Sequence, residues 1–173
     1  QTSNIFTKLV AGTYTAWVRN DNGCLVSQQF IILNSVSGVV NVTATKSANC
    51  ITIPLDIPLT AHDFKDISAF IIQLAFDPSI ISFNGISQMN VLLENGITSA
   101  TLVSPGILEI NFHAKDTLTL PADDQLLSLN FLGVSVGHSE LKWNSLQCVI
   151  YSASGYEIPA IYTQGSADIR PVP

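Results

Sequence analysis

The stretch Ser68-Ala-Phe-Ile-Ile-Gln-Leu-Ala-Phe76 decides the fold class of this chain. Its large apolar residues stand at every second position, namely Phe70, Ile72, Leu74 and Phe76. Successive side chains of a β-strand point to opposite faces of the sheet, so this period of two predicts a strand with one buried face. Asp77-Pro78 follows directly and ends the strand, because proline has no backbone N–H to donate.

The same alternation continues on both sides of this stretch. In residues 53–59 the large apolar residues face one way while Pro54 and Pro58 face the other, so we expect a strand at a sheet edge or one with a bulge. Residues 108–112 and 127–131 repeat the alternation. Turn sequences such as Asn84-Gly85 separate these segments, and no window has helical periodicity with caps. About nine strands at this spacing predict an all-β, two-layer sandwich or jelly roll.

The N-terminal part forms a separate pattern. Asn20-Asp-Asn-Gly23 lies between two strand-like segments, residues 13–18 and 25–33, which predicts a β-hairpin. Two strands cannot build a core alone, so we expect the hairpin to dock on another domain, on another chain, or on strands that precede Gln1. We therefore expect four segments along the chain. These are an incomplete domain (1–34), a linker (35–38), a complete sandwich (39–170) and the start of a further linker (171–173).

Composition excludes several classes of function. The formal net charge is -6 and only 12% of residues are charged, so there is no basic field to attract nucleic acid. The longest apolar runs, such as residues 71–76, are far shorter than the ~20 residues that span a bilayer, so we expect no direct membrane insertion.

The N-terminal segment also carries a family resemblance. Residues 6–24, with Ala11-Gly-Thr-Tyr14 and the Asn22-Gly-Cys24 turn, resemble the closing half of the immunoglobulin-like repeats in giant surface adhesins of gliding Bacteroidetes. Only that half is present. The resemblance implies an extracellular or cell-surface location and a piece of a longer protein.

The rest of the chain resembles a second family. Residues 39–169 look like a cohesin-type jelly roll, a nine-stranded sandwich related to some carbohydrate-binding modules. The resemblance is carried by residues 50–55, 67–78, 81–83, 106–112, 127–131, 154–158 and 165–169. A cohesin implies a dockerin partner, and the calcium loop of a dockerin is not encoded in this chain, which argues against self-pairing.

The sequence encodes no recognisable catalytic centre. The three histidines, His62, His113 and His138, are expected in or beside turns or on an outward strand face, and no nucleophile, phosphate-loop or metalloprotease motif is present. We therefore predict that the chain is not an enzyme and needs no cofactor. Cys50 and Cys148 are either buried apolar thiols or one disulfide bridge, and Cys24 has no evident partner.

Four carboxylates are candidate calcium ligands: Asp63, Asp66, Asp123 and Asp124. They are few for an ion that takes six to eight oxygens, and turn capping is the alternative role. Among the aromatic residues, Tyr156 and Tyr162 are candidates for stacking on sugars, whereas Trp143 lies in phase with Leu141 and is expected in the core.

Two short motifs are candidate glycosylation sites. Asn41-Val-Thr43 fits the N-glycan acceptor pattern. Asp116-Thr-Leu118 resembles the O-glycosylation site of Bacteroidetes proteins, which makes Thr117 the candidate residue in an expected loop.

The function that we predict is a structural or adhesive module of a large secreted or cell-surface bacterial protein. It would act through contacts with neighbouring domains of the same chain or with other copies, and it becomes a fibre subunit if another chain completes the hairpin. The alternative is a module that binds carbohydrate, or a dockerin-like partner or other surface protein.

Overall fold

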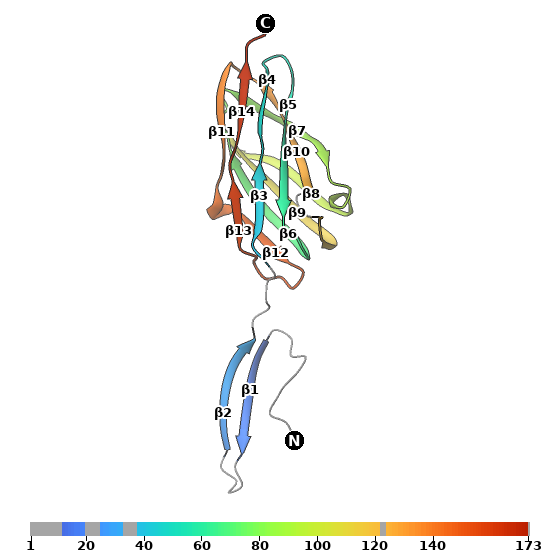
Figure 1. The fold of residues 1–173 in the computed structure, drawn as a ribbon, viewed down its shortest axis with the longest axis vertical. Coiled ribbons are helices and arrows are strands. Elements are labelled where there is room, and N and C mark those ends of the chain that lie inside the picture. The colour runs from blue at the N-terminus through green and yellow to red at the C-terminus, as the bar shows by residue number, and fades with distance from the viewer. Residues whose placement is uncertain (1–11, 20–24, 33–37, 122–123, 173) are drawn as a thin grey trace. The chain divides into compact units, whose positions relative to one another are not determined.

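The computed structural model describes residues 12–19, 25–32, 38–121 and 124–172. The chain divides into two compact units, Gln1–Val36 and Ser37–Pro173, and each is described by itself (Figure 1). Within the described residues, no helix is both long and apolar enough to cross a membrane. The predicted loop residues 20–24, with the turn and Cys24, lie outside the described residues, as do residues 33–37 and Asp123.

The first unit contains the predicted hairpin. Strands β1 (Gly12–Arg19) and β2 (Leu25–Ile32) pair antiparallel, from Gly12 opposite Ile32 to Arg19 opposite Leu25. The rings of Tyr14 and Phe30 stack across the two strands with centroids 5.9 Å apart. The hairpin prediction is therefore confirmed for the two strands.

The second unit is a sandwich of two sheets, as the sequence predicted. One sheet has five strands in the order β13-β3-β5-β10-β7, and the other has seven in the order β4-β14-β11-β6-β9-β8, with β12 also pairing with β6. We expected nine strands, whereas the described residues of this unit form twelve, because short flanking segments also pair.

The strands of the sandwich follow one another with short connections and two single-turn 3₁₀ helices. In chain order they are β3 (Val40–Ala44), β4 (Lys46–Cys50), β5 (Leu55–His62), β6 (Ile67–Ala75), β7 (Ile81–Met89), η1 (Leu93–Asn95), β8 (Gly96–Ser104), β9 (Ile107–Leu118), β10 (Asp124–Gly133), β11 (Gly137–Trp143), η2 (Ser145–Gln147), β12 (Val149–Ser152), β13 (Ala160–Thr163) and β14 (Gly165–Arg170).

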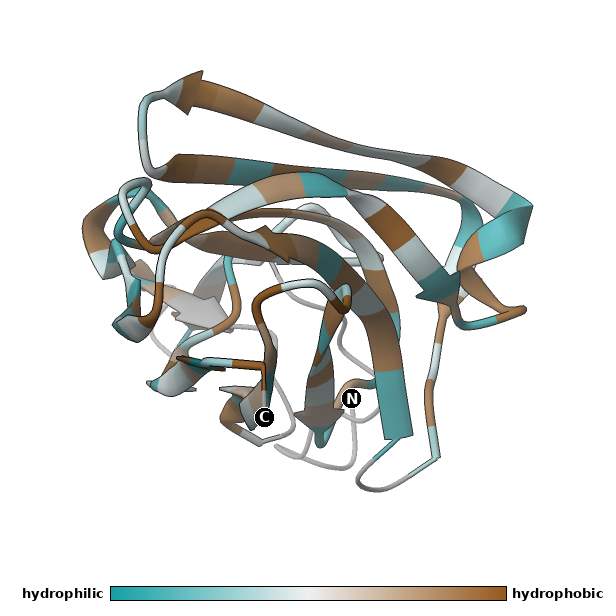
Figure 2. Cartoon of the chain, turned by 90° about the horizontal axis from the view of Figure 1, so that it is seen from above, coloured by the Kyte–Doolittle hydropathy of each residue, from teal (hydrophilic) through white to brown (hydrophobic). Residues whose placement is uncertain are grey.

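The core lies between the two sheets and is built from the alternating apolar positions. The predicted inward residues of β6 and of the strand at 108–112 are all buried, as are Leu127, Leu129 and Phe131 of β10. The ring of Phe131 contacts those of Phe76 and Phe83 edge-on, with centroids 5.2 and 5.7 Å away. Figure 2 shows the same alternation as brown and teal bands along the strands. The period of two therefore identified the core correctly.

The position of β5 corrects one prediction. The two prolines predicted an edge strand or a strand with a bulge. β5 lies in the middle of the five-stranded sheet, between β3 and β10, and its pairing with β10 has a register shift between Gln125 and Leu127. The carbonyl of Pro58 accepts a hydrogen bond from the N–H of Thr45, which follows the last residue of β3. The nitrogen of Pro58, which carries no hydrogen, faces the same side of the strand as its carbonyl. The missing hydrogen bond therefore falls in the β3–β5 ladder at the point where β3 ends. Pro54 and Ile53 precede the strand, and the side chain of Ile53 is exposed instead of inward.

The first and last strands of the sandwich change sheets together. β3 and β13 pair parallel in the five-stranded sheet, and β4 and β14 pair parallel in the seven-stranded sheet. Gly165 lies at the crossing, where a Cβ atom would come within 2.4 Å of the carbonyl oxygen of Thr45. Only glycine permits so close an approach of two backbones.

Candidate functional site

The outward side of β6 and β9 carries a group of hydrogen-bonded polar side chains. We call it the β6–β9 face and define it by Ile71, Gln73, Glu109 and Asn111, with Asn144 beside them. Gln73 stands opposite Glu109 in the antiparallel register, and Ile71 stands opposite Asn111. These side chains alternate with buried residues of the core and therefore point to solvent.

Hydrogen bonds join the polar members into one chain. The side-chain amide of Gln73 donates to Oε2 of Glu109 at 2.8 Å, and that of Asn111 donates to Oε1 at 2.9 Å. Asn144, which follows β11, donates to Oε1 of Gln73 at 3.1 Å. Both carboxylate oxygens are therefore engaged, and the four side chains hold one another in place.

The network fixes the charge of Glu109. The hydrogen bond from Asn111, followed by that from Gln73, lowers the pKa of this carboxyl below its ordinary value of 4.5. A carboxylate with a lowered pKa is a weak base, so this arrangement suits recognition by hydrogen bonds better than proton transfer.

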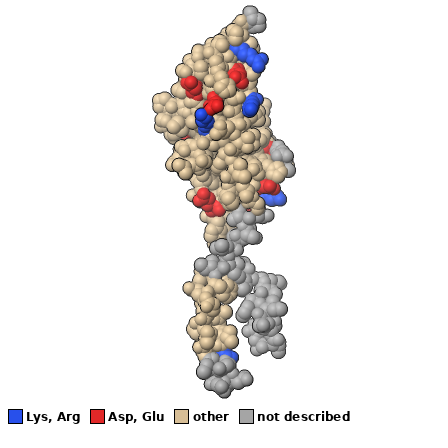
Figure 3. Space-filling view, turned by 60° about the vertical axis from the view of Figure 1, so that its left-hand side comes forward, with Lys and Arg blue, Asp and Glu red and all other residues tan. Residues whose placement is uncertain are grey.

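Exposed apolar side chains adjoin the network. Ile71 is 37% exposed although it sits in an interior strand, and Leu146 of η2, which contacts β6, is 92% exposed. Ile97 of β8 stands opposite His113 of β9 and is also exposed. Figure 3 shows one side of the sandwich, on which red and blue side chains lie among a larger number of other residues. Exposed apolar residues beside an ordered polar group are typical of the central part of a protein–protein interface.

Cys148 lies beside β6 and contacts the backbone of this face. Its sulfur accepts a hydrogen bond from the backbone N–H of Gln73 at 3.3 Å, and its S–H points toward the carbonyl of Asn144, also at 3.3 Å. Burial raises the pKa of the thiol, which keeps it protonated and weakly reactive. Cys50 and Cys148 are both free and half-buried in the structure. The structure therefore contains no bridge between them, since Cys50 ends β4 and pairs with Arg170 of β14, not with β6.

The calcium candidates take part in turns. Asp63 and Asp66 adopt left-handed backbone conformations, and the carboxylate of Asp63 is bonded to His62 at 2.9 Å. Oδ1 of Asp124 accepts from the N–H of Gln125, and Oδ2 accepts from the amide of Asn90, at 2.9 Å each. Among the described residues, which omit Asp123, no three His, Cys, Asp or Glu side chains are grouped as metal ligands. Of these three aspartates, Asp124 accepts from a backbone N–H, and the calcium assignment stays a prediction.

The two tyrosines proposed for sugar stacking differ in exposure. Tyr156 is half-exposed, whereas Tyr162 is partly buried and its ring lies 5.6 Å from that of Trp143. Burial raises the pKa of the Tyr162 phenol strongly. Trp143 is buried and donates from Nε1 to the carbonyl of Thr163 at 2.8 Å, which confirms its predicted core position. Tyr156 is therefore the more exposed of the two, and sugar stacking stays a prediction for both.

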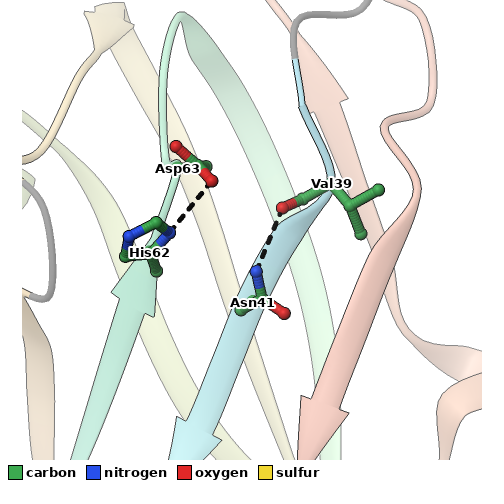
Figure 4. A network of polar contacts seen from close by, with 4 residues as sticks. All are labelled: Val39, Asn41, His62 and Asp63. Carbon is green, nitrogen blue, oxygen red and sulfur yellow. Dashed lines mark hydrogen bonds and ion pairs between the residues drawn. The ribbon is translucent and has the colours of Figure 1, made fainter.

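The glycosylation candidates both lie on strands. Asn41 belongs to β3, between two other strands, and its amide donates to the carbonyl of Val39 at 3.2 Å (Figure 4). Thr117 is exposed, but it lies near the end of β9 and not in the loop that we expected. It borders a hollow of about 380 Å³, together with Lys115 and Asp116. Asn41 is only partly exposed and lies between two paired strands, whereas Thr117 is exposed, so Thr117 is the more accessible of the two.

The histidines make surface contacts only. His62 is bonded to Asp63, as Figure 4 shows, and Nδ1 of His138 lies 2.7 Å from Oδ1 of Asp168. His113 is exposed on the outward side of β9. These positions agree with the predicted turns and outward strand face.

Sequence analysis missed the polar network of the β6–β9 face. Gln73, Glu109 and Asn111 each stand at an outward position of an alternating segment, which the sequence does show. Their side chains come together only because of the register of β6 with β9, which places Gln73 opposite Glu109, 36 positions later in the chain. A strand-pairing prediction for these two segments would have found it.

Comparison with known proteins supports the fold. No family model matches the sequence, and no curated protein matches it. Several solved cohesin structures do match. The sixth cohesin of scaffoldin B from Acetivibrio cellulolyticus, solved in complex with a Cel5 dockerin, is 13% identical with a TM-score of 0.67, covering 77% of this chain and 100% of that one.

Two further matches come from other organisms. The non-cellulosomal cohesin of the archaeon Archaeoglobus fulgidus is 11% identical with a TM-score of 0.64, covering 77% of this chain and 92% of that one. A cohesin of Clostridium acetobutylicum is 15% identical with a TM-score of 0.64, covering 76% and 90%. At this level of identity the likeness establishes a cohesin-like β-sandwich and nothing finer.

Proposed function

We propose that the sandwich unit is a non-catalytic module that binds a protein partner through the β6–β9 face. The observation that carries this proposal is the ordered network around Glu109, placed beside the exposed side chains of Ile71 and Leu146. The cohesin-like fold supports it, because several cohesins of the same fold were solved in complex with dockerins.

The chemistry of the face indicates the kind of partner. Apolar side chains at the centre of an interface supply most of the binding energy, and ordered polar groups supply specificity. Glu109 stays ionised and keeps acceptor capacity beyond its two amide bonds, so it favours a hydroxyl, an ammonium or a guanidinium on the partner. A small domain that presents an apolar patch with adjoining hydrogen-bond donors, such as a dockerin, fits this description.

The location outside the cell and the membership of a larger surface protein are part of the same proposal. They are supported by the cohesin-like fold and by the low fraction of charged residues. The resemblance of residues 6–24 to adhesin repeats is the source of the Bacteroidetes assignment, which remains a prediction.

The hairpin favours a second, structural role. Trp17, Val18, Leu25 and Val26 are exposed on its two strands. An isolated two-stranded sheet is marginally stable in water, so these residues favour a neighbouring domain or chain that covers them. We expect deletion of residues 1–34 to abolish any fibre assembly while the circular dichroism of the sandwich is retained.

Binding is tested by titration calorimetry of the full chain against a panel of purified dockerin domains in calcium buffer. We expect heat with at least one of them. Ile71→Asp should then weaken binding by roughly tenfold or more, because it places a charge at the centre of the contact. Leu132→Asp is the matched control, since Leu132 is 40% exposed on an interior strand of the other sheet.

Two results would contradict the proposal. One is equal loss of affinity in the two variants. The other is heat with soluble glycans and none with any dockerin, which would favour carbohydrate binding near Tyr156.

A further inference from the structure

Two Asn-Gly steps lie in the described part of the sandwich, Asn84-Gly85 within β7 and Asn95-Gly96 between η1 and β8. An asparagine before glycine can lose its amide without an enzyme, because glycine has no Cβ to keep its backbone nitrogen away from the side-chain carbonyl carbon. Both asparagines are exposed. Their local sequences and exposure are therefore alike, and the two sites differ in how the fold holds them.

Asn84 is held in place by its neighbours. It lies in a paired strand, where Gly85 stands opposite Asn130 of β10. Its side-chain amide donates to Oδ1 of Asn130 at 2.8 Å, and the amide of Asn130 donates to Oδ1 of Asp56, also at 2.8 Å. The side chain of Asn84 must break its hydrogen bond before its carbonyl carbon can turn toward the nitrogen of Gly85. A hydrogen bond of ordinary net strength slows this step by roughly fivefold.

Asn95 is less restrained. It is the last residue of the single-turn helix η1, and among the described residues its side chain has no hydrogen-bond partner. The N–H of Gly96 donates to the carbonyl of Leu93, and hydrogen bonds of this 3₁₀ type have poorer geometry than those of an α-helix. The carbonyl carbon and the attacking nitrogen are therefore easier to bring together at residue 95 than at residue 84.

We infer that Asn95 is a site of spontaneous deamidation. The backbone nitrogen of Gly96 attacks Cγ of Asn95, and the side-chain NH₂ leaves as ammonia with the proton of the attacking N–H, which gives a succinimide ring. Water then opens the ring at either carbonyl and leaves aspartate or isoaspartate at residue 95. The inference goes beyond the proposed partner binding, because it concerns a chemical change of the chain itself.

The packing of Gly96 makes the isoaspartate form a structural change. A Cβ atom at Gly96 would come within 2.6 Å of the carbonyl oxygen of His113 and of the ring of Phe112, so the chain is closely packed there. Isoaspartate adds one main-chain carbon directly before this residue. The pairing of Gly96 with Ala114 at the start of β8 has no room to absorb it. We therefore expect the first residues of β8 to lose their pairing in the modified chain.

Ageing of the full chain at mildly alkaline pH, followed by peptide mapping with mass spectrometry, tests the site. We expect an amide to be replaced by a carboxyl at residue 95 at a rate at least about fivefold higher than at residue 84. Asn95→Gln should abolish this product and leave the rate at residue 84 unchanged. No product at residue 95, equal rates at the two residues, or a faster change at residue 84 would overturn the inference.

Asn130→Ala tests why the two sites differ. It removes the hydrogen-bond acceptor of Asn84, so the rate at residue 84 should rise several-fold while the rate at residue 95 stays the same. Circular dichroism checks that the variant is folded. An unchanged rate at residue 84 in the folded variant would show that this hydrogen bond does not protect Asn84, and the structural argument would be wrong.

Hydrogen exchange of the aged chain tests the structural consequence. Amides of residues 96–98 should exchange faster than in the fresh chain. Asn95→Asp is the matched control, because it carries the charge of the product on an ordinary backbone and should exchange like the fresh chain. Equally fast exchange in Asn95→Asp would assign the effect to charge and contradict the expected strain at Gly96. Unchanged exchange in a chain that mapping shows to carry isoaspartate would contradict it as well.

Discussion

The hairpin and the sandwich contain the same kind of strand but differ in what covers it. In β1 and β2, apolar and polar residues are interspersed, and Trp17 and Val26 are exposed. In β6, similar apolar residues are buried to 1% exposure or less, because the second sheet lies against them. Alternation thus marks a strand, and only a second layer converts the strand into part of a core. The hairpin unit lacks that layer among its described residues.

The largest test of this comparison is the removal of one ring from the core. Phe131→Ala should lower the free energy of unfolding by about 3–5 kcal/mol, because it removes a fully buried phenyl ring and leaves a cavity. Urea unfolding followed by circular dichroism measures this change.

Trp17→Ala is the control within the hairpin. Its side chain is 62% exposed, so the unfolding free energy of the sandwich should change by less than about 0.5 kcal/mol. A large effect of Trp17→Ala on the sandwich transition would show that the two units unfold together, and the comparison would then be wrong.

A smaller effect is expected where a buried ring also carries a polar atom. Trp143→Phe removes the hydrogen bond from Nε1 to the carbonyl of Thr163 and should cost about 1–2 kcal/mol. Thermal and urea unfolding of the variant give the value. Tyr156→Phe should be nearly neutral, because Tyr156 is half-exposed, and a comparable loss in both variants would contradict the assignment of Trp143 to the core.

The smallest expected effect is a change in the pKa of Glu109 on the β6–β9 face. The folded pKa of Glu109 lies below its ordinary value, so its stabilising contribution is present above the unfolded pKa and is lost as the pH falls through the folded pKa. Asn111→Ala should raise the midpoint of the Glu109 carboxyl titration, measured by NMR, and Gln73→Ala should raise it less. Asn84→Ala on the other sheet is the control, and an unchanged midpoint in Asn111→Ala would show that the network is not formed in solution.

The sequence was sufficient to predict which face of each strand is buried, but not which strands lie next to one another. Phe70, Ile72 and Leu74 were assigned to the core because a period of two depends on one strand alone. The prediction that β5 lies at an edge was wrong. An interior strand accommodates Pro58 because β3, the neighbouring strand, ends opposite it. The sequence of β5 alone does not show where β3 ends. The β12 segment and other short strands were missed for the same reason, and the strand count was too low.

For the candidate site, too, the outward positions could be predicted but the contacts between strands could not. The outward positions of Gln73 and Glu109 could be predicted from alternation, but their hydrogen bond could not, because it depends on register. The sequence also gives no indication that the ring of Tyr162 lies beside that of Trp143, with centroids 5.6 Å apart. Both cases concern contacts between segments far apart in the sequence.

The parallel pairing of β4 with β14, at opposite ends of the sandwich sequence, affects the order in which the sandwich folds. β14 lies between β4 and β11, so the seven-stranded sheet stays split until residues 165–170 are in place. β4 can join that sheet only through β14, which lies more than a hundred residues later in the chain. Bringing such distant segments together costs loop-closure entropy before their contacts stabilise the fold. Folds dominated by such contacts therefore form slowly. We therefore expect the seven-stranded sheet to close only after β14 has been synthesised.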